Sequence, residues 1–175
     1  MTRVGGRKAS TANILPSIPY YFGYISTPST ITTTGRLLSW TTKTITDNFR
    51  QSSSCSKGLT TLKLGKTGKG MYEIKVNTSV IAGGNGSTAS LHIYKNGATV
   101  TKSTAYINAN QRNNCNLSYF VYLEEGDTIS IYGIAMSYNF VLLMNSCTFS
   151  ISFVPNRGWD NNSGGKLIST AEVLR

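Results

Sequence analysis

Apolar and polar residues alternate with a period of two along most of the chain, and short Gly- and Asn-rich segments separate the alternating stretches. In MYEIKVNTSVIAGG, Tyr72, Ile74 and Val76 share one face, whereas Glu73 and Lys75 share the other. A period of two predicts strands with one buried face and one wet face. No segment shows a convincing helical repeat. The pattern therefore predicts an all-β protein.

About eight strands are expected. In SLHIYKNGATV, Asn96-Gly97 supplies the two positive-φ positions of a type I′ turn, so this segment is expected to be a hairpin. In CTFSISFVP, Phe149, Ile151 and Phe153 are expected to face inward. The other expected strands lie in LLSWTTKTITDNF, LTTLKLGKTGKG, MYEIKVNTSVIAGG, LSYFVYLEEGDTISIYGIA and NFVLLMN. Short strands without intervening helices predict an antiparallel jelly-roll β-sandwich.

The same pattern divides the chain into three parts. Residues 37–155 are expected to form the jelly-roll domain, residues 1–36 an extended N-terminal arm, and residues 156–175 a Gly/Asn-rich C-terminal tail. The arm contains IPYYFGYI, whose large apolar residues are poorly solvated unless they dock on the core or on a neighbouring molecule. Tyr20, Tyr21 and Phe22 are therefore candidate interface residues.

Charged residues are sparse in this chain. Asp, Glu, Lys and Arg make up 14% of it, against about 25% in an average soluble domain. Ser, Thr, Asn and Gly must cover most of the surface, which suits contacts with copies of the same chain because few charges lose water there. The net charge is +10, and eleven of the seventeen basic residues lie in the first 75 positions. This balance fits a negatively charged partner such as nucleic acid, or solubility alone.

Residues for catalysis are lacking in the sequence. The single histidine, His92, lies in an expected strand, and no nucleophile-elbow, phosphate-loop or zinc-protease signature occurs. GGNGS and KLGKTGKG are Gly-rich but lack the spacing of a nucleotide-binding loop, so they are interpreted as turns. Three cysteines without CxxC or Cys/His spacing predict buried free thiols. We therefore expect a protein that is not an enzyme and has no cofactor.

The beginning of the chain, MTRVGGRKASTANILPSIPYYF, is basic but lacks the apolar region of a secretory signal. The longest wholly apolar run, FVLLM, is far too short to span a membrane. The protein is therefore expected to be made and kept in a cytosolic compartment, or to be released by lysis.

Four segments resemble a known family. GMYEIKVNTSVIA, ASLHIYKNGATV, YLEEGDTISIYG and CTFSISFV occur in the order and spacing of the jelly roll shared by complement-q globular heads and tumour necrosis factor. The resemblance covers about residues 40–155 and implies the fold. It also implies trimers with aromatic residues along a threefold axis. Candidates for that seam or for the core, with the core favoured for each of them, are Tyr119, Phe120, Tyr122 and Tyr132.

The segment YLEEGDTISIYG holds three of the seven acids. By the resemblance, Gly126-Asp127 is the turn that begins a core strand, with Asp127 accepting hydrogen bonds from nearby amides. Glu124 and Glu125 are adjacent, so on a strand they point to opposite faces and do not form an acid–base pair. A calcium site using these carboxylates, as in some complement-type heads, is the alternative.

Two functions follow as hypotheses. The first is a viral structural protein, a jelly-roll capsid subunit (coat, penton or surface lattice) that self-assembles into the virion shell after synthesis in the host cytosol. Its partners are then copies of itself, other capsid proteins and genomic nucleic acid, which Arg3, Arg7, Lys8 and Arg36 are expected to face. The alternative is a trimeric recognition head of a fibre or spike that binds a host protein or glycan.

Overall fold

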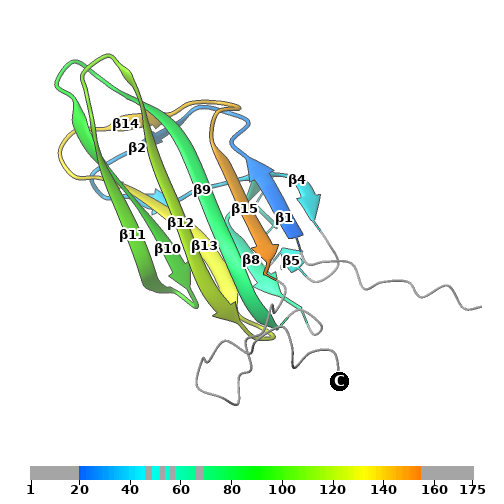
Figure 1. Cartoon of the computed structure of the whole chain (residues 1–175). Helices are drawn as coiled ribbons and strands as arrows, with labels where there is room; N and C mark the ends of the chain where they lie inside the picture. Colours follow the sequence, from blue (N-terminus) through cyan, green and yellow to red (C-terminus); the bar gives the residue numbers. More distant parts are fainter. Residues whose placement is uncertain (1–19, 46–48, 52–53, 56–57, 66–68, 155–175) are drawn as a thin grey trace, which may run out of the picture.

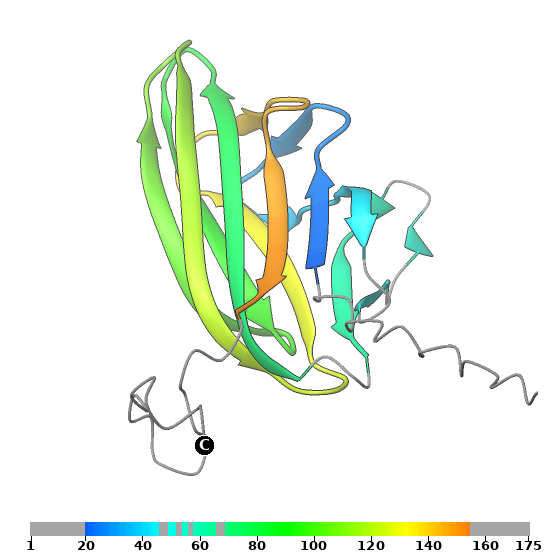
Figure 2. The same cartoon turned by 45° about the vertical axis from the view of Figure 1, so that its right-hand side comes forward.

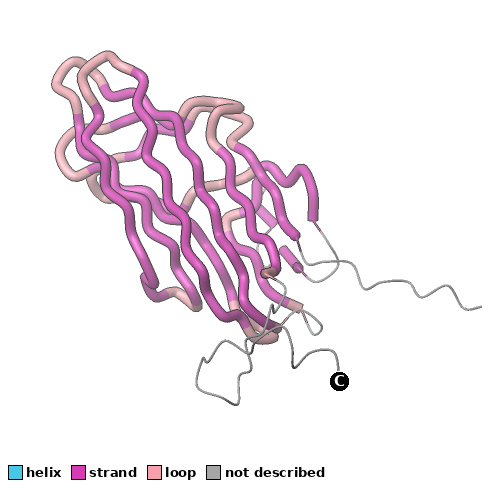
Figure 3. Tube along the Cα trace, viewed as in Figure 1, coloured by secondary structure: helices cyan, strands magenta, loops and turns pink. Residues whose placement is uncertain are grey.

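The computed structural model describes residues 20–45, 49–51, 54–55, 58–65 and 69–154 of the chain. Two antiparallel sheets, sheet A and sheet B, pack face to face around one hydrophobic core (Figure 1). Every regular element in the described ranges is a β-strand (Figure 3). The predicted all-β sandwich is confirmed.

Sheet A is organised around the long strand β9 (Gly70–Ala82). On one side β9 pairs with β12 (Arg112–Leu123), and on the other with β15 (Thr148–Phe153) and then β14 (Phe140–Leu142). Figure 2 shows β12 in yellow-green, β9 in green, β15 in orange and β1 in blue, side by side. The remaining strands of sheet A are β1 (Tyr20–Tyr24), β4 (Thr41–Ile45) and β2 (Ser29–Ile31).

Sheet B covers the opposite side of the core. Its strand order is β11-β10-β13-β8-β5, and β3 also pairs with β13. The bounds are β11 (Ala98–Ile107), β10 (Ser87–Lys95), β13 (Thr128–Ala135), β8 (Thr61–Leu64), β5 (Phe49–Gln51) and β3 (Arg36–Leu37). Two further strands, β6 (Ser54–Cys55) and β7 (Gly58–Leu59), pair with each other.

Phe149 lies at the centre of the core. Its ring contacts those of Tyr21 and Trp40, with ring centroids 5.2 and 5.4 Å apart. Ile151 is also buried, and Phe153 is partly buried against the core, so all three predicted inward positions of β15 are confirmed. Burying one side chain of this size stabilises a fold by about 1.5–3 kcal/mol. The alternation in the sequence therefore identifies the residues that hold the two sheets together.

Two turns are fastened to each other at one end of the sandwich. Asn96 and Gly97 have φ values of 52° and 80°, as the predicted type I′ hairpin requires. In the β12–β13 turn, an Asp127 carboxylate oxygen accepts a hydrogen bond from the Glu124 amide at 2.8 Å, and Gly126 has a φ of 87°. Asn96 Nδ2 donates to Asp127 Oδ1 at 2.6 Å, and Lys95 Nζ lies 2.8 Å from Asp127 Oδ2. The predicted Gly-Asp turn is confirmed, and it joins strands of both sheets.

The N-terminal boundary differs from the expectation. Residues 20–36 were assigned by their composition to an arm outside the jelly roll, but β1 and β2 are hydrogen-bonded strands of sheet A. Tyr21, Ile25 and Ile31 are buried in the core. The composition of this segment is misleading because YYFGY carries aromatic rings at both odd and even positions, so its alternation cannot be seen. The predicted residues 1–19 of the arm and 156–175 of the tail lie outside the described residues.

Candidate functional site

Acidic and metal-ligating side chains do not gather in the described part of the chain, where no group of three or more His, Cys, Asp or Glu residues could hold a metal ion. Glu124 and Glu125 are exposed on the β12–β13 turn. Burial raises the pKa of Asp127, but hydrogen bonds from Lys95, Asn96 and the Glu124 amide outweigh it, so the net pKa lies below the ordinary value. The Asp127 carboxylate therefore stabilises the turn itself.

His92 is enclosed by neighbouring side chains on β10. Its ring lies 6.3 Å from that of Tyr94 and 6.4 Å from that of Tyr132, measured between centroids, and its Nε2 lies 3.0 Å from Ser90 Oγ. Burial, and secondarily the positive charge of Lys102, lower the pKa of His92. The contacts of His92 with Ser90, Tyr94 and Tyr132 make it a packing residue on the outward side of β10.

Two of the three cysteines have described side chains, Cys115 and Cys147, and both are buried free thiols, as predicted. Burial raises the pKa of each, which keeps them protonated and unreactive.

No described helix is long and apolar enough to cross a membrane.

The outward side of sheet A, called face A below, is wide and mostly uncharged. The register aligns Phe22, Ser150, Lys75 and Ser118 in one row across four strands. Its one acid, Glu73, is paired with Lys75 at 2.9 Å. Face A consists of Tyr20, Phe22 and Tyr24 on β1, Thr148, Ser150 and Ser152 on β15, Glu73, Lys75 and Asn77 on β9, and Asn116, Ser118, Phe120 and Tyr122 on β12.

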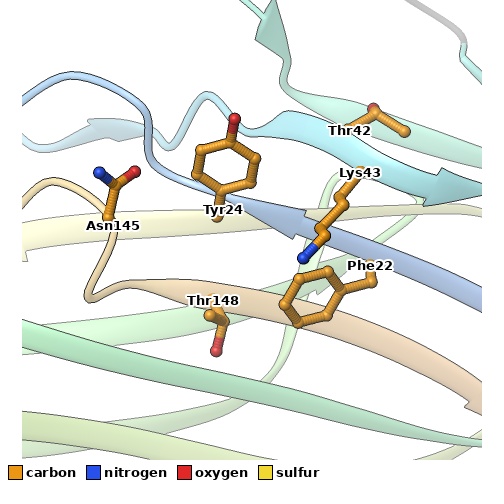
Figure 4. Close-up of a pocket in the computed structure, with 6 residues that line it drawn as sticks. All are labelled: Phe22, Tyr24, Thr42, Lys43, Asn145 and Thr148. Atoms are coloured by element: carbon orange, nitrogen blue, oxygen red, sulfur yellow. The ribbon is translucent and has the colours of Figure 1, made fainter.

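A hollow with a volume of about 600 Å³ opens at the β1–β4 end of face A (Figure 4). The rings of Phe22 and Tyr24 lie in it, and Lys43 reaches from β4 toward Phe22. It is completed by Thr42, Asn145 and Thr148. At the opposite edge of the same face, the side chain of Phe120 on β12 is 57% exposed. Face A therefore carries a ring-lined hollow at one edge and a projecting ring at the other.

The predicted interface residues divide between this face and the core. Tyr20, Phe22, Phe120 and Tyr122 belong to face A. Tyr21 instead points inward, where burial raises its pKa to about 12. Tyr119 is partly buried against the core, so the core alternative holds for it. Adjacent residues of a strand point to opposite faces, so Tyr119 points toward the core while Phe120 points outward.

Tyr132, the seventh predicted interface residue, lies on the other sheet. Its hydroxyl donates a hydrogen bond to the Thr34 carbonyl oxygen at 2.7 Å. A Cβ atom on Gly35 would come within 2.5 Å of the Tyr132 ring, so only glycine allows this contact. Tyr132 thus fastens the turn between β2 and β3 to sheet B.

Of the predicted nucleic-acid-facing residues, the described part of the chain includes Arg36 alone. Arg3, Arg7 and Lys8 lie outside the described residues, and Arg36 is exposed on the short strand β3. GGNGS forms the β9–β10 connection as predicted, with Gly86 at a φ of 65°. The middle of KLGKTGKG, residues 66–68, lies outside the described residues.

The outward side of sheet B, called face B below, was not recognised in the sequence. It consists of Thr88, Ser90, His92 and Tyr94 on β10, Lys102, Thr104 and Tyr106 on β11, Ser130, Tyr132 and Ile134 on β13, Met136 just beyond it, Leu37 on β3, and Thr61 and Lys63 on β8. Tyr106 and Met136 are 65% and 64% exposed. Their proximity depends on the register of three strands, so no single segment signals it.

The fold is that of a tumour necrosis factor-like jelly roll. Crystal structures of murine APRIL superpose on the chain with TM-scores of 0.59 (pH 5.0), 0.53 (pH 8.5) and 0.55 (pH 8.0), at sequence identities of 10%, 8% and 9%. Each comparison covers 78% of this chain, and 99%, 98% and 98% of the respective APRIL chains. No family model and no curated protein matches the sequence. At these identities the likeness establishes the fold, and the predicted resemblance to the tumour necrosis factor jelly roll is confirmed at that level.

Proposed function

We propose that this protein is the non-enzymatic recognition head of a homotrimer whose subunits meet through face A. The observation that carries the proposal is the hollow at one edge of face A together with the projecting Phe120 ring at the other edge. Two different patches that fit each other make a head-to-tail contact, and such contacts close into rings when the rotation allows. A ring of three is the arrangement expected with a tumour necrosis factor-like fold.

The chemistry of face A supports burial between subunits. A buried aromatic side chain removes about 150–250 Å² of surface from water, and five such side chains lie on this face: Tyr20, Phe22, Tyr24, Phe120 and Tyr122. Between them lie Ser, Thr and Asn, which lose less on desolvation than ions do. The Glu73–Lys75 pair is internally neutral. Face A therefore offers apolar area, and the main electrostatic cost of burying it falls on Lys43 in the hollow.

The mass of the protein in solution tests this proposal. Size-exclusion chromatography with light scattering is expected to give a species close to three times the 19.0 kDa chain mass. Ser150→Arg, at the centre of face A, introduces an unpaired charge and is expected to yield folded monomers. Thr99→Arg, at an exposed position of β11, is the matched control and should leave the mass unchanged. A wild-type monomer, or identical masses for all three proteins, would contradict the proposal.

The capsid hypothesis predicts a different outcome in the same measurement. A coat subunit should form a closed shell or a large salt-sensitive assembly, since phosphate neutralisation makes nucleic-acid contacts depend on salt. Removal of residues 1–19 should then abolish the large assembly and leave a folded core. A discrete trimer that is unaffected by this removal would favour the recognition head.

A further inference from the structure

We propose that face B is a docking surface for an acidic segment of another protein, a partner that the proposed recognition head would bind. The inference rests on the proposed function only for the direction that face B takes in the assembly. The two sheets cover opposite sides of one core (Figure 2). If face A is closed off between subunits, face B points away from them and stays accessible.

The apolar part of face B is contiguous across neighbouring strands. Tyr106 is the partner of Thr88 in the β10–β11 register, and the Met136 amide donates to the Thr88 carbonyl oxygen at 2.8 Å, so the three residues form one row. Cross-strand neighbours of this kind have Cβ atoms about 5 Å apart. Further along the face, Leu37 is 40% exposed beside Tyr132. Tyr and Met are enriched at the centres of protein–protein interfaces.

The strands of sheet B carry charge of one sign, although the adjoining β12–β13 turn, which approaches Lys63, carries Glu124, Glu125 and Asp127. The strands themselves contain five basic residues and no acid: Arg36, Arg50, Lys63, Lys95 and Lys102. Lys95 is paired with Asp127 at the β12–β13 turn. Lys63 and Lys102 are exposed, and neither has an ion-pair partner among the described residues. A protein surface that presents Asp or Glu around an apolar centre complements this arrangement.

Other negatively charged partners fit less well. Nucleic-acid binding depends on neutralising many phosphates, and a typical site makes about 6–10 phosphate contacts, whereas face B carries two lysines. Of the exposed apolar side chains of face B, Tyr106 has a flat ring, whereas Met136 and Leu37 have none for stacking on a base or a sugar. Aliphatic and thioether groups next to tyrosines favour a protein as the occupant.

The size of face B predicts the strength of binding. The three long strands β11, β10 and β13, with the shorter β8 and β3 beside them, lie about 4.8 Å apart and rise about 3.3 Å per residue, so together they cover about 500 Å². This is below the roughly 800 Å² that each partner contributes to a standard stable interface. One face B is therefore expected to bind weakly, and several in one assembly to bind strongly through avidity.

Random short peptides displayed on phage provide the probe. Panning on the wild-type chain is expected to select peptides that combine Asp or Glu with aromatic or aliphatic residues. A selected peptide, synthesised with a fluorophore, should bind at least about tenfold more weakly to Tyr106→Ser and to Met136→Ser. Lys102→Glu should weaken binding of the acidic peptide, and a copy of the peptide with Lys in place of its acids should bind Lys102→Glu better than wild type. Lys69→Glu, an exposed position before β9, is the matched control and should behave like wild type.

Three results would overturn the inference. One is a set of selected peptides without acidic enrichment. Another is unchanged binding in the Tyr106, Met136 and Lys102 variants. The last is specific binding to a glycan array, or to an oligonucleotide, with none to peptides. Circular dichroism on every variant shows whether a loss of peptide binding comes from unfolding. Light scattering shows whether the chain is a trimer. Peptide binding by a folded monomer would sustain the inference about face B while contradicting the proposed trimer.

Discussion

Face A and face B arise from the same alternation of inward and outward residues, yet their chemistry differs. Face A spreads its aromatic side chains at both edges around a field of Ser, Thr and Asn, with its one acid neutralised by Lys75. Face B gathers its exposed apolar residues, Tyr106 and Met136, in one row and has basic groups without acids. The contrast teaches that the inward half of each strand sets the fold, while the outward half is free to differ between sheets.

The largest effect is expected for the residue on which both faces depend. Phe149→Ala removes the ring that contacts Tyr21 and Trp40 across the core. Large-to-small changes of this kind cost about 3–5 kcal/mol. Urea unfolding should show that loss, and both the trimer and peptide binding should weaken together. Loss of one activity without the other would mean that the faces do not share a common support.

A matched pair of exposed rings separates the two faces. Phe120→Ser should weaken trimer association by about 1.5–3 kcal/mol for each buried ring, as measured by sedimentation at decreasing concentration. Tyr106→Ser should leave association unchanged. Because both rings are more than half exposed in the single chain, each change should alter the free energy of unfolding of the isolated chain by no more than about 0.5 kcal/mol. Equal effects of both changes on association would remove the distinction between the faces.

A backbone position affects face B alone. Gly35 has a φ of 67°, and its missing side chain makes room for Tyr132. Gly35→Ala should cost about 1–2 kcal/mol from the left-handed conformation, plus the displacement of the Tyr132 ring. Thermal unfolding should show the loss, and peptide affinity should fall while the assembled mass stays the same. A normal peptide affinity would indicate that Tyr132 does not shape face B.

The sequence identified one set of features because they are local. The alternation on β9, the Asn96-Gly97 hairpin and the inward Phe149 each depend on a few neighbouring residues, and all are present in the structure. Whether Tyr119 or Phe120 points outward depends on which alternate positions of the strand face the core. A shift of one residue reverses the face of every side chain in a strand. β1 was missed because Tyr21 and Phe22 are both aromatic, so its inward and outward positions cannot be told apart by hydrophobicity.

The candidate sites were harder to predict for a physical reason. Phe120 and the hollow at Phe22 and Tyr24 come from strands at opposite edges of sheet A. Tyr106 and Met136 become neighbours only through their pairing with β10. Such proximity is set by long-range strand register, which no short motif encodes. Arg3, Arg7 and Lys8 remain predictions, because they lie outside the described residues.

The smallest effect is expected at the turn that joins the sheets. The folded pKa of Asp127 lies below its ordinary value of 3.8, so its contribution to stability is present above that value and is lost as the pH falls through the lowered folded pKa. Unfolding free energies of wild type and Asp127→Asn should therefore differ at neutral pH, by no more than about 1 kcal/mol, and converge in acid. A constant difference at every pH would exclude the carboxylate as the cause.

Sedimentation velocity of the wild-type chain, diluted from micromolar to nanomolar concentration beside Ser150→Arg, tests the central claim most directly. The account predicts a wild-type species of about three chains that the variant cannot form, with both proteins equally folded by circular dichroism. A wild-type chain that sediments as a folded monomer at every concentration would show that face A is not a subunit contact.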